Sequence, residues 1–327
     1  MSLLASLTGE LRTPEEVRAA VYLFGDEAQA ARSRFWLLLI LASVIASAGV
    51  LADSTATVIG AMIIAPLATP IHGVGVALAG GELRALLASA RTLLLGGLTV
   101  VAIGAGCAFV LPELVSTAGN SQITGRTAPT LLDLVAAAAT GLAGSLAIAR
   151  RDIGDILPGV AIAISLVPPL AVVGVTASDG AWDDALGALL LFTTNVLAIV
   201  VMGSVLYSLT GLLPQQGEVP RMRPAYTVVA AAGVVVVLAL AVATFRTVQL
   251  ERRQNAATAV AREWAAGNGE RLLTTRYQGD ALVVVVEGAG GGDDAQLLRL
   301  LDDAVPPGTP VELNRVSGQH RRLGDVD

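Results

Sequence analysis

The side chains with the most chemical potential in this sequence are polar groups that interrupt long apolar stretches. They are Asp53, Ser54, Thr55, His72, Ser165, Thr194 and Asn195. Polar and ionisable groups are costly inside a membrane, and there they usually face a cavity or a partner. Carboxylate, hydroxyl and amide oxygens can coordinate a cation, and a neutral imidazole can relay a proton or bind a ligand. This set predicts a binding site for a small or ionic solute.

Several of these residues also have a structural interpretation that the sequence leaves open. Asp53 could cap the helix that follows it, because Asp is favoured at that position. His72 could be a satisfied histidine at a helix end. Asn195 could hydrogen-bond to a neighbouring helix and stabilise packing instead of holding an ion.

The sequence lacks the signatures of common enzyme classes. It has no Lys, which excludes the phosphate-binding loop G-x-x-x-x-G-K-[ST]. His72 and His320 are the only histidines and lie in different regions, so no metal-binding histidine pair is expected. Ser145 would need His72 as its base to act as a nucleophile, and nothing beyond residue type supports that pairing. We expect a protein that is not an enzyme and that needs no cofactor.

Composition predicts a polytopic α-helical membrane protein. Hydrophobic residues make up 54% of the 327 residues and charged residues only 15%, whereas a soluble domain carries about 25% charge. The net charge of −6 comes without a basic patch, so a nucleic-acid partner is not expected. Segments of about 20 apolar residues can cross a bilayer. Seven are present, at residues 35–52, 55–79, 92–111, 129–149, 156–177, 185–213 and 225–245.

The arginines predict the orientation of these spans. With a cytoplasmic N-terminus, the inside segments carry ten Arg and the outside loops carry only Arg126, as the positive-inside rule requires. Seven spans then place the C-terminal region outside the cytoplasm, although Arg246, Arg252 and Arg253 argue against the last crossing. The Ala- and Gly-rich composition, with Arg but no Lys, indicates a GC-rich prokaryotic genome, so the plasma membrane is the expected location.

Polar regions flank the predicted transmembrane domain at residues 35–245. Within residues 1–34, Thr13 and Pro14 begin an amphipathic helix that would lie against the membrane or the helix bundle. Residues 246–327 hold 22 charged side chains and predict a soluble α/β domain. Its expected elements are a helix at 249–266, strands at 271–278 and 281–287, a helix at 293–305 and a strand at 310–316.

The second and fifth spans share a proline-rich pattern. Pro66 and Pro70 interrupt one, and Pro168 and Pro169 interrupt the other, while Gly75-Val76 matches Gly174-Val175. Proline removes a helical hydrogen bond, and a freed carbonyl in lipid must be satisfied by protein or water. The pattern predicts two copies of a three-span unit, at about 35–111 and 129–213. Because three is odd, the copies would be inverted, with the broken helices lining a transport site; kinked packing helices are the alternative.

The same segments resemble a known family. They read DSTATVIGAMIIAPL at 53–67, PIHG at 70–73, PGVAIA at 158–163 and PPL at 168–170. In these stretches the chain resembles the bacterial and archaeal membrane family called domain of unknown function 389, over about residues 35–210. Family members often have Asn where this chain has Asp53. The resemblance implies a polytopic membrane protein and supplies no substrate.

Two functions are therefore expected from different classes. The first is a transporter or channel for a small or ionic solute, with its site at the broken second and fifth spans. The second is a membrane scaffold or envelope sensor that displays the C-terminal α/β domain. A homo-oligomer in the lipid bilayer is the default expectation for either.

Overall fold

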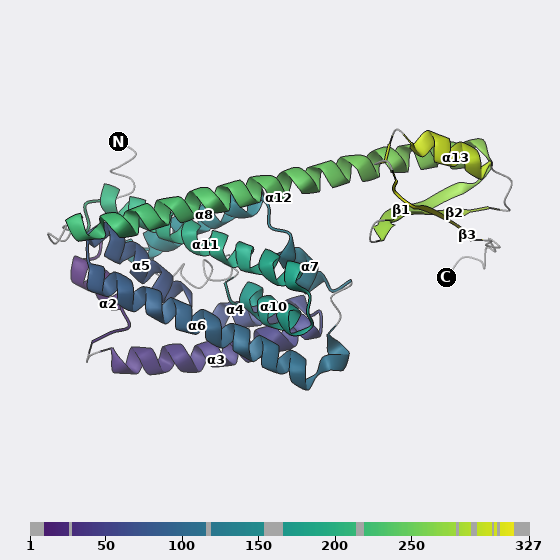
Figure 1. Cartoon of the computed structure of the whole chain (residues 1–327). Helices are drawn as coiled ribbons and strands as arrows, with labels where there is room; N and C mark the ends of the chain where they lie inside the picture. Colours follow the sequence, from purple (N-terminus) through teal and green to yellow (C-terminus); the bar gives the residue numbers. More distant parts are fainter. Residues whose placement is uncertain are drawn as a thin grey trace, which may run out of the picture. The chain divides into compact units, whose positions relative to one another are not determined.

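The computed structural model describes residues 10–25, 28–115, 119–153, 166–213, 219–278, 281–288, 293–302, 304–305 and 308–316. The chain divides into two compact units, residues 1–243 and residues 244–327 (Figure 1). The first unit is helical, and the second contains a small sheet. Each unit is described by itself.

The helices of the first unit account for most of the predicted spans. They are α2 (Pro14–Val21), α3 (Gln29–Leu51), α4 (Thr55–Ile64), α5 (Ala68–Gly80), α6 (Leu83–Val110), a 3-10 turn (Pro112–Leu114), α7 (Ser121–Thr127), α8 (Leu131–Ala149), α10 (Val167–Ser178), α11 (Trp182–Leu209) and the start of α12 (Val219–Gly267). Among the described residues, five helices are long and apolar enough to cross a membrane, namely α3, α6, α8, α11 and the Arg223–Val242 part of α12.

The second predicted span is broken as its prolines predict. Helices α4 and α5 together are long and apolar enough to span, and they bend by 47° at the break between them. Ala65 is extended, because the residue before a proline is disfavoured in helical geometry. Of the fifth predicted span only the second half, α10, is described, and residues 154–165 lie outside the described residues. The described residues therefore contain five candidate spans, or six if the bent pair is counted as one.

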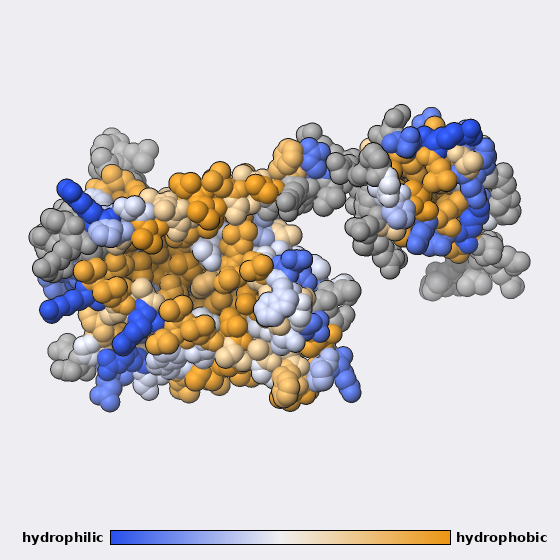
Figure 2. Space-filling view, viewed as in Figure 1, coloured by the Kyte–Doolittle hydropathy of each residue, from blue (hydrophilic) through white to orange (hydrophobic). Residues whose placement is uncertain are grey.

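Much of the surface of this unit that Figure 2 shows is apolar. Leu37, Leu94 and Leu132 are 61%, 65% and 79% exposed although they lie on long apolar helices. Contiguous apolar surface of this kind marks an interaction with another apolar phase. Together with the spanning helices, it supports a membrane-embedded protein.

Small residues let the buried helices approach closely. A Cβ added to Gly104 of α6 would lie 2.7 Å from the carbonyl oxygen of Ala171 in α10, and one added to Gly141 of α8 would lie 2.8 Å from Ile199 Cα in α11. Such contacts replace the hydrophobic driving force that is absent between helices in lipid.

Two of these crossings correspond to each other in sequence. A Cβ on Gly75 of α5 would meet the backbone of Val200 and Ser204 in α11, and a Cβ on Gly174 of α10 would meet the backbone of Val101 and Ala105 in α6. Each of these residues in one crossing has a counterpart in the other crossing that lies 99 positions away in the sequence (75 and 174, 101 and 200, 105 and 204). Helices α5 and α10 also begin 99 positions apart, at Ala68 and Val167.

The second unit contains the predicted sheet. Strands β1 (Arg271–Gln278), β2 (Ala281–Glu287) and β3 (Val311–Val316) form a sheet in the order β1-β2-β3, antiparallel and then parallel. Helix α13 (Asp294–Leu301) provides the crossover that a parallel pair requires. Its Leu297 and Leu301 pack with Trp264 of α12 and with the inward face of β2.

Helix α12 differs from the prediction. Residues 225–245 and 249–266 were expected to be two helices, but they belong to one helix that runs from Val219 to Gly267. The physical reason is that residues 246–248, Arg-Thr-Val, contain no Gly or Pro to end a helix. The charged residues after the apolar segment make that part of the helix favour water over lipid, but they do not break its backbone hydrogen bonds.

Candidate functional site

The Asp53–Thr55 turn between α3 and α4 contacts the start of α7. Ser121 Oγ donates to Asp53 Oδ1 at 2.7 Å, and the backbone N–H of Gln122 donates to the same oxygen at 3.1 Å. The Gln122 side chain donates to Thr55 Oγ1 at 2.8 Å. These contacts join residues almost 70 positions apart in the chain.

Ser54 provides the cap that was considered for Asp53. The hydroxyl of Ser54 accepts from the N–H of Thr57 at 3.4 Å at the start of α4. In the part of the chain that the structure describes, Asp53 is the one non-glycine residue with a positive φ, at +48°. Asp tolerates this left-handed conformation better than most residues. The hydrogen bond from Ser121 lowers the pKa of Asp53, so the carboxylate is charged near neutral pH.

The residues on α7 were missed by sequence reasoning. Asn120 caps α7 by accepting from Gln122 N at 2.9 Å and Ile123 N at 3.1 Å, and its amide donates to Val50 O at 2.8 Å. Asn before a short helix is a cap signal that the sequence did contain. Arg126 donates to Gln122 O at 2.7 Å.

The break between α4 and α5 holds the next group of predicted residues. Thr69 N donates to Pro66 O at 3.1 Å, and Pro70 lies in the first turn of α5. His72 is 3% exposed, and its Nδ1 has no hydrogen-bond partner in the described part of the chain. A buried polar nitrogen of this kind requires an explanation, such as a water, an ion or a ligand.

The second group lies on α10 and α11. Pro168 and Pro169 occupy the first turn of α10 and are buried. Thr194 of α11 is fully buried and its hydroxyl donates to Leu190 O at 2.7 Å, while Asn195 is 7% exposed. Ser165 lies outside the described residues. Helix α11 packs against both α5 and α10, so it connects the two proline-bearing elements.

The starts of α5 and α10 are poor in hydrogen-bond donors. The first four N–H groups of a helix have no partner within the helix. Two of the first four residues of α10, Pro168 and Pro169, carry no N–H, and in α5 Pro70 carries none while Thr69 is bonded to Pro66 O. Pro66 also cannot donate to a carbonyl of α4. The first turns of both helices therefore offer few free N–H groups.

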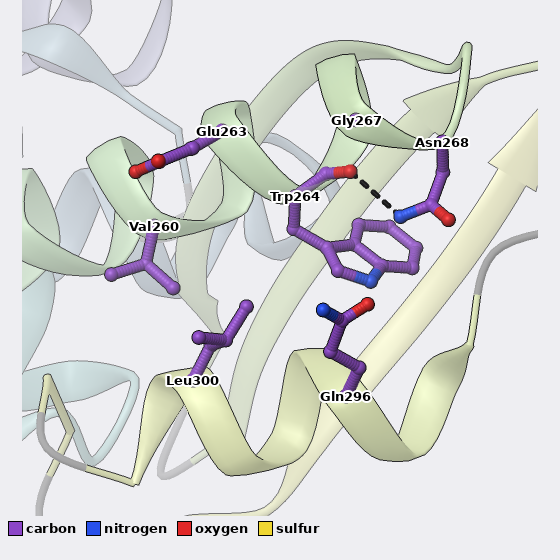
Figure 3. A pocket seen from close by; sticks show the side chains of 7 residues that line it. All are labelled: Val260, Glu263, Trp264, Gly267, Asn268, Gln296 and Leu300. Atoms are coloured by element: carbon purple, nitrogen blue, oxygen red, sulfur yellow. Dashed lines mark hydrogen bonds between the residues drawn. The ribbon is translucent and has the colours of Figure 1, made fainter.

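The second unit has a hollow of its own. A pocket of about 350 Å³ lies between the end of α12 and α13, and it is lined by Val260, Glu263, Trp264, Gly267, Asn268, Gln296 and Leu300 (Figure 3). Gln296 extends from α13 toward the indole of Trp264, and Asn268 Nδ2 donates to Trp264 O at 2.8 Å. Arg315 stacks over the same ring, 5.9 Å from its centroid. Within the described ranges, no group of three or more His, Cys, Asp or Glu could hold a metal ion.

Comparison with known proteins confirms the family resemblance. Residues 62–201 match the sequence model of the family described as domain of unknown function (DUF389). An uncharacterized protein of Methanocaldococcus jannaschii is 32% identical over 206 residues, which cover 63% of this chain and 63% of that protein. The chain thus spans less than two thirds of that relative. No solved structure matches this chain. The matched region includes α5, α6, α8 and α10, and neither comparison assigns an activity.

Proposed function

We propose that the first unit is a transporter or channel for a small or ionic solute, built from an inverted repeat of three spans. The observation that carries this proposal is the reciprocal crossing of α5 on α11 and α10 on α6 at a constant separation of 99 residues. An element of each copy packs on the last helix of the other copy. This exchange is what a twofold axis between two copies produces.

The turns that follow the two short helices support the same correspondence. Glu82 N donates to Ala77 O and Ala181 N donates to Thr176 O, each at 2.9 Å. Gly81 and Gly180 both have positive φ, at 72° and 79°. These donors, acceptors and glycines are again 99 positions apart. With three spans in each copy, a twofold axis in the membrane plane makes the copies inverted.

The contacts among loops support the proposed orientation. Arg18 of α2 pairs with Glu82 in the α5–α6 turn at 2.8 Å, and Arg151 after α8 pairs with Glu16 at 2.7 Å. All these segments belong to the arginine-rich side assigned to the cytoplasm. The Asp53 turn and α7, assigned to the outside, contact each other instead. A location in a prokaryotic plasma membrane and a C-terminal domain outside the cytoplasm are parts of this proposal.

The solute site lies at the breaks before α5 and α10. A half-helix that starts inside a membrane protein is tolerated where it lines a cavity. Because the first turns of α5 and α10 offer few free N–H groups, the site suits a cation or a solute that donates hydrogen bonds. His72 on α5 and Asn195 on α11 provide side-chain groups near this level, and no catalytic step or cofactor is required. Assembly into a homo-oligomer is also part of the proposal.

Flux through proteoliposomes tests the proposal. The probes are radioactive sodium, rubidium and chloride ions, with empty liposomes as the baseline. Asn195→Leu should abolish flux while assembly is retained, because it removes the amide from α11. Thr193→Leu is the matched control, since the exposed Thr193 hydroxyl donates to Leu189 O in its own helix. Equal flux in both variants would remove Asn195 from the site.

The pocket beside Trp264 favours one alternative, a membrane scaffold or envelope sensor that uses the second unit. Deletion of residues 247–327 separates the two proposals. A scaffold would lose its function on deletion and tolerate substitution of Pro66 and Pro169. A transporter would keep flux without these residues and lose it when the prolines are replaced.

A further inference from the structure

An apolar cavity of about 350 Å³ lies between α6 and α11, and none of the polar candidate-site residues lines it. Every residue that lines it is Ala, Gly, Val, Leu or Phe. Its volume falls in the range of about 300–1,000 Å³ that is typical of ligand sites. No side chain that lines it could bind a polar or charged solute.

The lining shows the same internal correspondence as the helix crossings. Leu93 and Phe192, Leu98 and Leu197, and Val101 and Val200 all line the cavity, and the members of each pair are 99 positions apart. Corresponding residues of the two proposed copies therefore line the cavity together. It is a feature of the repeat and not an irregular packing defect.

The position of the cavity along α6 and α11 determines the depth at which it lies in the membrane. Its lining residues in α6 fall within 90–101 and those in α11 within 189–200, near the middle of Leu83–Val110 and Trp182–Leu209. Helices of this length cross the hydrocarbon core, so their middle lies at the level of lipid chains. Leu94, Leu98 and Leu189 are 65%, 56% and 42% exposed, which leaves the cavity open at its side.

We propose that this cavity binds the hydrocarbon chain of a membrane lipid. The wholly apolar lining, the depth in the bilayer and the lateral opening each select an acyl chain over a headgroup or a soluble ligand. Val229 of α12 borders the cavity, so the last span forms part of its rim. The lipid chain then fills the contact between the two copies of the repeat.

A photoreactive lipid tests the inference on the full-length protein. The probe is a phosphatidylglycerol with a diazirine at the middle of one acyl chain, diluted in unlabelled lipid vesicles. Labelled peptides are mapped by mass spectrometry. In the native protein, labelling at 90–101 and 189–200 should exceed labelling at Phe109, which is 85% exposed on the outside of α6.

Filling the cavity should remove the excess labelling. Gly97→Phe places a ring in the cavity, since a Cβ at Gly97 meets only Leu170 Cδ1, at 3.6 Å. Gly106→Phe is the matched control on the same helix, because nothing lies within 4 Å of its Cβ. Val196→Phe fills the cavity from α11 and provides a second variant if Gly97→Phe does not assemble.

The outcomes are distinct. Labelling that falls to the Phe109 level in Gly97→Phe or Val196→Phe, and stays high in Gly106→Phe, supports the proposal. Equal labelling of the cavity and of Phe109 in the native protein overturns it, because the lipid would then be ordinary surrounding lipid. Labelling of Phe109 without labelling at 90–101 and 189–200 in the native protein would also overturn it, because no lipid chain would then occupy the cavity.

Discussion

Substitution of the two corresponding glycines by alanine should have opposite effects. Gly174 of α10 and Gly75 of α5 occupy equivalent places in the two helix crossings, but the distances differ. A Cβ on Gly174 would lie 2.2 Å from Val101 O and 2.7 Å from Ala105 N, both backbone atoms. A Cβ on Gly75 would lie 3.5 Å from Val200 O, which is ordinary van der Waals contact.

The magnitudes follow from these distances. Gly174→Ala forces α6 and α10 apart, and overpacking of this kind costs about 1–3 kcal/mol. Gly75→Ala makes no such clash, and alanine is favoured over glycine in a helix by up to about 1 kcal/mol. We therefore expect Gly174→Ala to destabilise the first unit and Gly75→Ala to leave it unchanged or slightly more stable.

Thermal unfolding in lipid nanodiscs measures the difference. For a unit of this size, 1 kcal/mol corresponds to about 2–4 °C in midpoint temperature, so the two variants should differ by several degrees. Gly60→Ala is a control, since nothing lies within 4 Å of its Cβ in α4. Equal midpoints for Gly174→Ala and Gly75→Ala would refute the close contact of α10 with α6, and with it the geometric argument for the repeat.

Two further predictions concern charged groups outside the spans. The hydrogen bond from Ser121 lowers the pKa of Asp53 in the folded state. The stability that this carboxylate contributes is therefore present above its unfolded pKa of about 3.9 and is lost as the pH falls through the lower folded value. Asp53→Asn should flatten the pH dependence of the unfolding free energy below about pH 4, and an unchanged profile would contradict this. In the second unit, Arg315→Met leaves the Glu270 side chain, which is 2% exposed, without its ion partner, and this should lower the free energy of unfolding by about 3 kcal/mol. Arg299→Met breaks an exposed pair with Asp293 and should lower it by less than about 1 kcal/mol. Chemical denaturation of both variants measures the difference.

Much of the fold could be predicted because apolar length and breaker residues act locally. Helices α3 and α8, the break at Pro66, and strands β1 and β2 fall where hydrophobic runs and turn residues place them. The unbroken α12 could not be predicted from charge, because the polar residues after the last span continue the helix without a stop signal. Helix α7 was missed because it is short and is held by long-range bonds to Asp53 and Val50.

The candidate site was less predictable, because it depends on which helices touch. Sequence spacing identified the prolines and the buried His72 and Asn195, but not that Asp53 contacts α7. Thr194 shows the same limit, since its hydroxyl bonds to a carbonyl of its own helix. The residue types that suggest ligand binding are also those that satisfy a helix backbone, and only the three-dimensional arrangement separates the two roles.

The crossing of α5 and α11 and the corresponding crossing of α10 and α6 differ in polarity. At the crossing of α5 and α11, Ser204 Oγ lies 3.3 Å from Gly75 O and also donates to Val200 O at 2.6 Å.

The counterpart of Ser204, 99 positions away, is Ala105, so the crossing of α10 and α6 has no hydroxyl at this place. The apolar crossing is also the tighter one, since the added Cβ would meet backbone at 2.2 Å there and at 3.5 Å in the polar crossing. A helix contact that is both looser and polar is the one that can open to admit a solute. If transport uses this contact, Ser204→Ala should alter flux, whereas Ala105→Ser should leave it unchanged, and the reverse result would assign the site to the other crossing.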